Sequence, residues 1–291
     1  MTLFNCKIKD LQLKGKIENQ NATGMPILVI QGGPGISYDY LLNLAELLNN
    51  HPIVFYNPIA YDNKSDVVDE SLLSFEHFSE EIDHIRKDLN LSDCIILSHS
   101  AGTVITLDYL LRHPTGVKAS IFISPVFSVK FYQSFMEKLL STFPEQVQTV
   151  IKQDIQGADV DPIDHMEAMA HFYQNHMCRL AQWPDALLNV SKDINLSMMN
   201  YLWGPNDFNV KGIWRDFERL EYLSQITIPT LLLSGEFDFI THQSCQFYAN
   251  DLSQAVVAEI KNASHSPNYE NPDALKSITE AFLKEYHLCA E

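Results

Sequence analysis

The sequence predicts an α/β fold in which a mostly parallel sheet of about eight strands is flanked by helices. Two features support this: nearly continuous apolar, β-branched runs, and amphipathic stretches of helical period between them. Such runs are typical of strands buried on both faces, as in a parallel sheet. They lie at residues 26–30, 52–56, 94–98, 119–124, 230–234 and 255–260. Alternation of strand and helix favours the α/β class.

The clearest helix between these strands is predicted within "SFEHFSEEIDHIRKDLN", residues 74–90. Its apolar side chains recur at spacings of three and four, which places them on one helix face. They are Phe75, Phe78, Ile82, Ile85 and Leu89. We expect the acids and bases of this segment to lie on the opposite, solvated face.

The last helix is predicted to begin at "NPDALKSITEAFLKEY". Asn271 is the expected N-cap and Pro272 the first helical residue, because proline is well suited to that position. Between residues 127 and 216 the strands stop, and helix-like periodicity with many aromatic residues takes their place. We therefore predict a core formed by residues 1–126 and 217–291, interrupted by a helical cap at 127–216.

Composition narrows the function classes. The chain has 291 residues and a formal net charge of −17, which disfavours binding to nucleic acid or anionic membranes. Five scattered cysteines without C-x-x-C spacing favour neither a disulfide framework nor a zinc site. We find neither a signal-peptide pattern nor an apolar run of the roughly 20 residues that span a bilayer. We expect a cytoplasmic protein that does not bind membranes.

A candidate nucleophile lies in "CIILSHSAGTVITLDYLLRHP", where a predicted strand meets a predicted helix. A sharp turn there needs small residues two before and two after its centre, and it exposes the central hydroxyl. Ser98 and Gly102 are those small residues. Ser100 is therefore the candidate nucleophile.

A serine hydroxyl needs a base and an acid that orients the base. In this type of fold both follow the serine in the chain, the acid first, each in a loop after a late strand. "LLLSGEFDF" ends one such strand and offers Glu236 and Asp238, of which Asp238 is preferred for its place in the loop. His265, in "EIKNASHSPNYENP", is the candidate base.

The glycines of "VIQGGPGISYDY", residues 29–40, fit either a tight turn or a loop whose N–H groups bind negative charge. Acyl transfer through Ser100 creates an oxyanion that needs two preorganised donors. We assign them to the N–H groups of Gly33 and Ala101. The loop lacks the lysine of a phosphate-binding loop, and the spacing of His171 and His176 does not indicate a metal site.

These motifs resemble the proline iminopeptidase branch of the α/β-hydrolases, with particular similarity to the tricorn-interacting aminopeptidase. The resemblance runs over about residues 26–286 and rests on "QGGPG", "SHSAG", "WPDALL", "WGPNDF", "SGEFD" and "SHSPNYENP". It implies a Ser-Asp-His triad of Ser100, Asp238 and His265 beneath a helical cap. It also implies that acidic residues bind the free amino terminus of a short peptide, with Asp207 where the family has a cap glutamate.

The sequence departs from the family pattern at four places. Gln31 replaces a histidine of the glycine loop, and Ser98 replaces a glycine of the nucleophile turn. Residues 56–65, "YNPIAYDNKS", have lost the family motif D-Q-x-G-x-G-x-S. Phe239 stands where the related aminopeptidase has a second amine-binding glutamate, so amine recognition is less well supported than hydrolysis.

Three functions remain open at this point. The first is an aminopeptidase that releases N-terminal proline or small apolar residues from short peptides. The second is an esterase or amidase for small neutral acyl substrates, and the third is a non-catalytic binding protein. No metal or organic cofactor is implied. The sequence indicates no oligomeric state.

Overall fold

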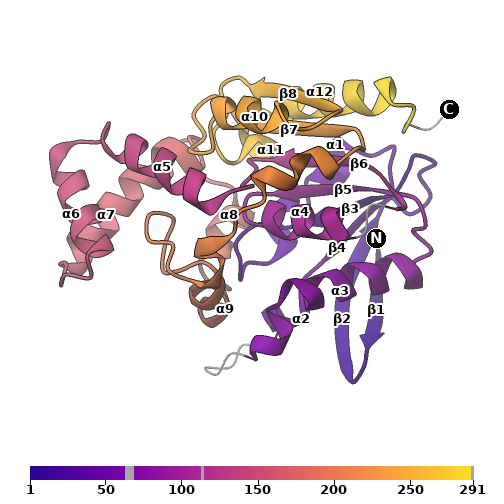
Figure 1. Ribbon diagram of the computed structural model, residues 1–291, viewed down its shortest axis with the longest axis horizontal. Helices are drawn as coiled ribbons and strands as arrows, with labels where there is room; N and C mark the ends of the chain where they lie inside the picture. Colours follow the sequence, from indigo (N-terminus) through magenta and orange to yellow (C-terminus); the bar gives the residue numbers. More distant parts are fainter. Residues whose placement is uncertain (63–68, 113–114, 290–291) are drawn as a thin grey trace.

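The computed structural model describes residues 1–62, 69–112 and 115–289, and its centre is an eight-stranded sheet (Figure 1). The strand order is β1-β2-β4-β3-β5-β6-β7-β8. The strands are β1 (Thr2–Ile8), β2 (Leu11–Glu18), β3 (Ile27–Ile30), β4 (Ile53–Tyr56), β5 (Cys94–His99), β6 (Val117–Ile123), β7 (Thr230–Gly235) and β8 (Ala255–Ile260). From β4 to β8 all neighbours are parallel. The predicted fold class and all six located strands are confirmed.

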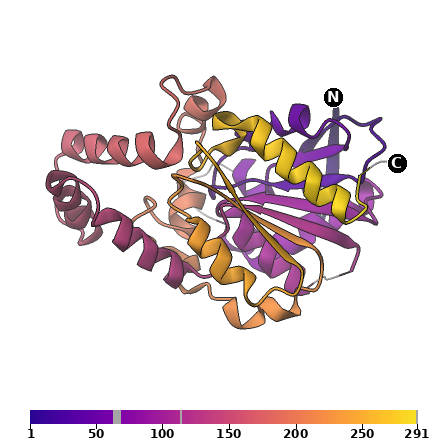
Figure 2. The same ribbon diagram turned by 90° about the horizontal axis from the view of Figure 1, so that it is seen from above.

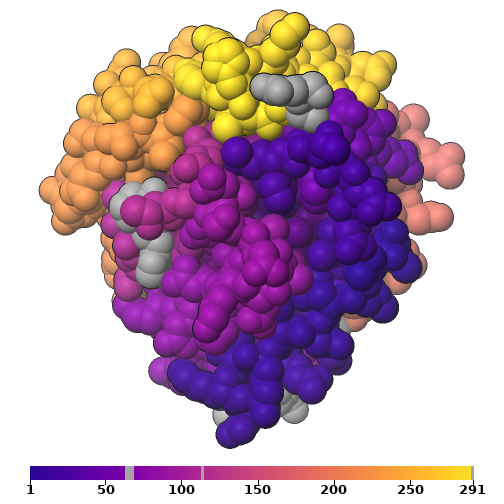
Figure 3. Space-filling view, turned by 90° about the vertical axis from the view of Figure 1, so that its right-hand side faces the viewer, coloured from indigo at the N-terminus to yellow at the C-terminus, as the bar shows by residue number. Residues whose placement is uncertain are grey.

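The two strands that the apolar runs did not locate are β1 and β2. They form an antiparallel hairpin, and β2 pairs antiparallel with β4. Exposed and buried side chains are mixed along both strands, because only one face of the hairpin is covered. In Figure 3 the N-terminal segment (indigo) extends down the right side to the bottom of the face turned away from the helical insertion.

Helices cover both faces of the sheet. One face packs against α3 (Phe75–Asp88), α4 (Gly102–Arg112) and α10 (His242–Ala249), and the other against α1 (Leu44–Leu47) and α12 (Pro272–Glu285). Figure 2 shows α12 crossing the strands diagonally. The short helices are α2 (Ile59–Asp62) and α11 (Pro267–Glu270). Successive residues of the buried strands contribute to opposite cores, which explains their continuous apolar sequence.

Helix α3 confirms the predicted apolar face and corrects its charged one. Phe78, Ile82 and Ile85 are buried, as expected. Glu81 is also fully buried, so the prediction that all charged residues lie on the solvated face is wrong there. Its carboxylate accepts a hydrogen bond from Ile59 N (2.8 Å), a donor that would otherwise be buried without a partner. Burial raises the pKa of Glu81.

Helix α12 begins as predicted. The Asn271 side chain accepts a hydrogen bond from Ala274 N (3.2 Å), and Pro272 is the first helical residue. An N-cap of this kind satisfies one of the free N–H groups of the first turn.

The segment between β6 and β7 is helical. It contains α5 (Val129–Leu140), α6 (Glu145–Ile155), α7 (Pro162–Phe172), α8 (Asp185–Val190) and α9 (Leu196–Leu202), with a π-helical turn at Tyr173–Met177. All of residues 127–216 are described, and none belongs to a β-strand. Helices α5 to α7 project from the end of the sheet that lies farthest from both chain termini (Figures 1 and 2). A helical insertion is therefore confirmed.

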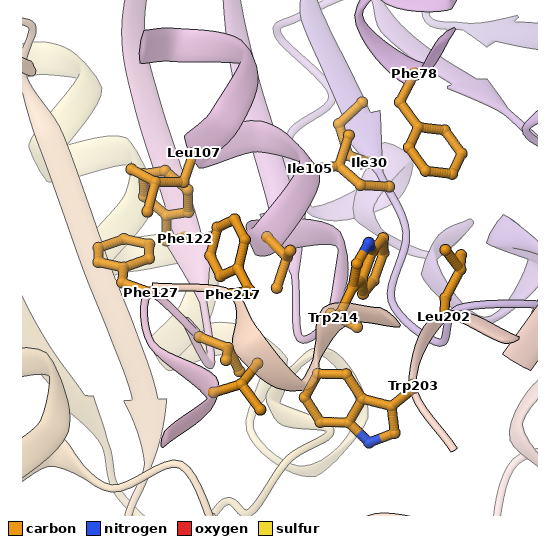
Figure 4. Packing of buried hydrophobic residues seen from close by; sticks show 14 of the residues in the cluster. Ile30, Phe78, Ile105, Leu107, Phe122, Phe127, Leu202, Trp203, Trp214 and Phe217 are labelled. Atoms are coloured by element: carbon orange, nitrogen blue, oxygen red, sulfur yellow. The ribbon is translucent and has the colours of Figure 1, made fainter. Parts of the chain in front are cut away.

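The insertion is anchored to the core through aromatic side chains near its C-terminal end. Trp214, which is 2% exposed, stacks on Phe75 of α3 with ring centroids 5.8 Å apart. Figure 4 shows Trp214 and Trp203 close to Leu202, on the side of the core formed by Ile30 and Ile105. This packing fixes the returning chain against the sheet, where it forms one wall of the cavity described below.

Within residues 1–62, 69–112 and 115–289, no helix is both long enough and apolar enough to cross a membrane.

Candidate active site

Ser100 lies at the turn between β5 and α4, with a φ of +52°. Its N–H donates to Ile123 O (2.9 Å), which holds this unusual conformation in place. Two residues on, Gly102 packs so closely on the glycine loop that an added Cβ would lie 2.2 Å from Gln31 O. The turn therefore requires a residue without a side chain at position 102, in agreement with the small residue predicted there from the sequence.

Ser98, the first small residue of the turn, lies two residues before Ser100. Its side chain is fully buried, and its hydroxyl has no hydrogen-bond partner among the described residues. The hydroxyl therefore takes no part in the contacts around Ser100.

The loops after β7 and β8 bring Asp238 and His265 together. Asp238 Oδ1 lies 2.9 Å from His265 Nδ1, and Asp238 Oδ2 accepts a hydrogen bond from Ser124 Oγ (2.5 Å). Because the carboxylate accepts a hydrogen bond from Nδ1–H, the proton of a neutral ring stays on Nδ1 and Nε2 is free to act as a base. Ile240 N also donates to Asp238 Oδ1 (2.9 Å), which fixes the carboxylate.

Glu236, the other candidate acid, points elsewhere. It is exposed, accepts a hydrogen bond from Asn262 N (3.0 Å) and lies 3.8 Å from Lys261 Nζ. Of the two acids, only Asp238 contacts His265.

Ser100 and His265 line one cavity of about 420 Å³ beneath the helical insertion. No hydrogen bond joins their side chains, and such bonds often form only when substrate is present. Most other wall residues are apolar and come from the insertion; they include Met177, Trp183, Leu187, Val190, Met199 and Trp203. The cavity therefore offers a shielded, largely apolar site above the candidate nucleophile.

The glycine loop presents a free donor to this cavity. Gly32 N donates to Tyr40 Oη (2.8 Å), so its N–H is already used. Within the described part of the chain, the N–H groups of Gly33 and Ala101 have no hydrogen-bond partner, and Gly33 lines the cavity. These are the two donors that the sequence assigned to an oxyanion. Gln31, at the start of the loop, has a buried Oε1 without a hydrogen-bond partner among the described residues.

His99, which the sequence motifs did not point to, links the His265 loop to Tyr40 and, through Tyr40, to the glycine loop. Its Nε2 lies 2.9 Å from His265 O and its Nδ1 lies 2.8 Å from Tyr40 Oη. A carbonyl only accepts, so Nε2 carries the proton and Nδ1 accepts from Tyr40, whose oxygen accepts from Gly32 N. Burial lowers the pKa of His99 to about 3, and the nearby His265 contributes. His99 therefore stays neutral and positions both the glycine loop and the His265 loop.

Because His99 is buried in its neutral form, we expect the stability of the fold to decrease at acidic pH. The pKa of His99 falls from 6.5 to about 3 on folding, so below pH 6.5 only the unfolded chain takes up the proton. Stability is lost as the pH falls from 6.5 towards 3, by about 2 kcal/mol at pH 5. Between pH 7 and pH 5 the free energy of unfolding should therefore fall less in His99→Gln than in the wild-type protein, by about 2 kcal/mol. Urea denaturation at the two pH values measures this difference. An equal pH dependence in both proteins would contradict this assignment.

Asp207 lines the same cavity as Ser100. It is the only acid among the described residues of the cavity wall, which include no lysine or arginine. None of the ion pairs in the described part of the chain involves it. Its backbone is held by Tyr132, whose hydroxyl donates to Asp207 O (2.9 Å). The carboxyl group reaches the cavity but is surrounded by protein, and this burial raises its pKa.

Phe239 does not face the cavity. It is 3% exposed, and its ring stacks on the His265 ring with centroids 4.2 Å apart. It therefore supports the candidate base through packing, in a place where a carboxylate would add a second negative charge. Residues 56–65 have lost a family motif, and positions 63–65 of this segment lie outside the described residues.

The described histidines and cysteines show no arrangement that would bind a metal. His171 and His176 pack against Phe143, and His176 Nδ1 bonds to Phe237 O (2.8 Å). No group of three metal-ligating side chains occurs in residues 1–62, 69–112 and 115–289. All five cysteines are free thiols.

Comparison with known proteins points to one family. A family model for the alpha/beta hydrolase fold matches residues 25–272. Over 266 residues the chain is 30% identical to a proline iminopeptidase of Heyndrickxia coagulans, covering 91% of this chain and 92% of that protein. The chain is also similar to the crystal structure of a proline iminopeptidase of Mycobacterium smegmatis, with a TM-score of 0.90 and 21% identity. The superposition covers 100% of this chain and 100% of that one. The crystal structure of VinJ is similar, with a TM-score of 0.89 at 22% identity over 98% of this chain and 99% of that one.

Proposed function

The chain belongs to the α/β-hydrolase family and is related to the proline iminopeptidases, and we propose that it is a serine aminopeptidase. In this proposal it releases N-terminal proline or small apolar residues from short peptides. Ser100 is the nucleophile, His265 the general base and Asp238 the acid that orients it. The N–H groups of Gly33 and Ala101 stabilise the oxyanion.

The reaction proceeds through an acyl-enzyme. Ser100 Oγ attacks the first peptide carbonyl while His265 Nε2 takes its proton, and the negative charge on the carbonyl oxygen meets the two N–H groups. The C–N bond then breaks as His265 returns the proton to the leaving amine. Water, deprotonated by His265, next attacks the ester carbon. The acyl group leaves as the free amino acid, and the proton returns to Ser100.

The observation that carries the aminopeptidase proposal is the position of Asp207. A lone carboxylate shares a small apolar cavity with the candidate nucleophile, without a cationic partner among the described residues. Burial raises the pKa of Asp207, so the ionised form is held at an energetic cost. A bound ammonium group would remove that cost, which makes a free amino terminus a better ligand than a neutral group.

The test is Asp207→Asn, assayed with a free-amine aminoacyl 2-naphthylamide, its N-acetylated counterpart and a simple ester. We expect wild-type protein to prefer the free amine. The variant should lose about ten- to a hundredfold of kcat/KM on the free amine, because one charge-assisted bond is lost and the ammonium is left unpaired. Ester hydrolysis should change little.

Asp216→Asn is the matched control, because it removes the same charge from an exposed site in the insertion. It should keep the preference for the free amine. Equal losses on all substrates in Asp207→Asn would indicate a structural role for this residue. A wild-type preference for the acetylated substrate would exclude the aminopeptidase.

One observation favours a second candidate, an esterase or amidase for small neutral acyl substrates. Asp207 is the only carboxylate among the described residues of the cavity wall, and most of that wall is apolar. A neutral acyl group fits such a wall without the need for a charged partner. The same three substrates distinguish the two candidates.

A further inference from the structure

A second cavity, of about 650 Å³, lies beside the one that contains Ser100. Tyr173, Trp183 and Leu188 line both cavities, so the two cavities are adjacent. A ligand that is bound at Ser100 and extends past these residues would enter the second cavity.

Arg179 is the only charged residue among the described residues that line the second cavity. Its guanidinium lies over the Phe237 ring, 3.4 Å from the centroid, which fixes its orientation. The other four arginines donate hydrogen bonds through their side chains; they are Arg86, Arg112, Arg215 and Arg219. The Arg179 guanidinium has no hydrogen bond or ion pair with any described residue. In a chain of net charge −17, an unpaired guanidinium in a cavity is a candidate anion site.

The backbone of Arg179 is tied to the loop that carries His265. Arg179 N donates to Glu270 Oε1 (2.8 Å), while Glu270 Oε2 accepts from Ser264 N (2.8 Å) and Ser264 Oγ (2.7 Å). The nearby acid is therefore occupied by these donors and leaves the guanidinium free. His265 N also donates to His176 O (3.0 Å), so the turn before Arg179 lies against the same loop.

The chemistry of the leaving group explains what this arginine can bind. His265 returns its proton to the leaving nitrogen, so the departing peptide lies on the His265 side of the scissile bond. Arg179 is anchored to that side. We propose that the second cavity holds the leaving peptide and that Arg179 binds its free C-terminal carboxylate. The proposal rests on the proposed function and specifies its substrates as di- or tripeptides with both termini free.

The arrangement separates two opposite charges. Asp207 lines one cavity and Arg179 the next, with the candidate nucleophile beside Asp207. A short peptide carries an ammonium at its N-terminus and a carboxylate at its C-terminus. The ammonium would lie near Asp207 in the first cavity, and the carboxylate near Arg179 in the second. A planar guanidinium accepts a carboxylate through two parallel hydrogen bonds. Because Arg179 is exposed, we expect a moderate preference that decreases at high salt.

The test compares kcat/KM for L-prolyl-L-alanine and its C-terminal amide in wild-type protein, Arg179→Gln and Arg179→Lys. We expect wild-type protein to prefer the free acid by about five- to twentyfold at low ionic strength. The ratio should fall to about one in Arg179→Gln and remain intermediate in Arg179→Lys, which keeps the charge but not the planar fork. Each ratio is internal to one protein, so a general loss of activity does not affect it.

Arg215→Gln is the matched control, since it removes the same charge from an exposed arginine paired with Asp216. It should keep the wild-type ratio. A wild-type ratio near one, or an unchanged ratio in Arg179→Gln, would overturn the Arg179 site. Hydrolysis of L-proline 2-naphthylamide by wild-type protein reports separately on the proposed function. If that substrate is cleaved while the ratio is near one, only the Arg179 proposal fails.

Discussion

Ser100→Ala should abolish hydrolysis of every substrate, with a fall in kcat of roughly 10⁵-fold or more. Among the described residues, Ser100 is the serine that adopts a left-handed conformation directly after β5. It also lines the cavity together with His265. Without the oxygen no acyl-enzyme forms, and only the N–H groups and binding contacts remain. Steady-state assays with a free-amine naphthylamide and an ester measure the loss. Mass spectrometry after fluorophosphonate treatment should find an adduct on Ser100 in the wild-type protein only.

Ser98→Ala is the matched control, because Ser98 lies two residues earlier, near the end of β5. Its buried hydroxyl has no partner among the described residues, so its removal should leave both activity and labelling in place. Labelling of Ser100→Ala at the wild-type level would remove Ser100 from the role of nucleophile. Absence of any adduct in the wild-type protein would favour a non-catalytic binding protein.

Asp238→Asn should reduce kcat by about 10³- to 10⁴-fold while the fold persists. The carboxylate accepts hydrogen bonds from His265 Nδ1, Ser124 Oγ and Ile240 N. If the amide turns its NH₂ group to the ring, the ring carries its proton on Nε2 and cannot act as the base. If it keeps its oxygen there, where Ile240 N also donates, the ring still loses the negative charge that stabilises its protonated form. The measurement is kcat with the same ester and naphthylamide, together with urea denaturation to compare the stabilities.

Glu236→Gln is the control for this prediction, because both acids lie in one loop and the sequence offered both. Glu236 contacts Asn262 N and lies near Lys261 on the surface, away from His265. We expect its loss to change kcat by less than about twofold. A loss in Glu236→Gln as large as that in Asp238→Asn would reverse the assignment.

The sequence by itself determined the features that depend on short-range patterns. The six buried strands follow from runs of apolar residues, because a strand covered on both faces has no polar side. The α12 N-cap follows from the local chemistry of Asn271 and Pro272. The tight turn at Ser100 likewise follows from its small neighbours, since larger ones would collide with the next segment.

Only the tertiary structure decided which distant groups meet. Asp238 rather than Glu236 contacts His265, Phe239 stacks on that ring, and Glu81 is buried against Ile59. The β1–β2 hairpin escaped the search for apolar runs because only one of its faces is covered.

The contacts of His99 and Arg179 have the same origin. His99 reaches a carbonyl 166 positions along the chain, and Arg179 reaches Glu270, 91 positions away. Periodicity and spacing describe neighbours along the chain, whereas these contacts depend on how strands and loops are packed side by side. The sequence therefore determined where a hydrolytic site could form, and the packing of the helical insertion on the sheet decided which charges line it.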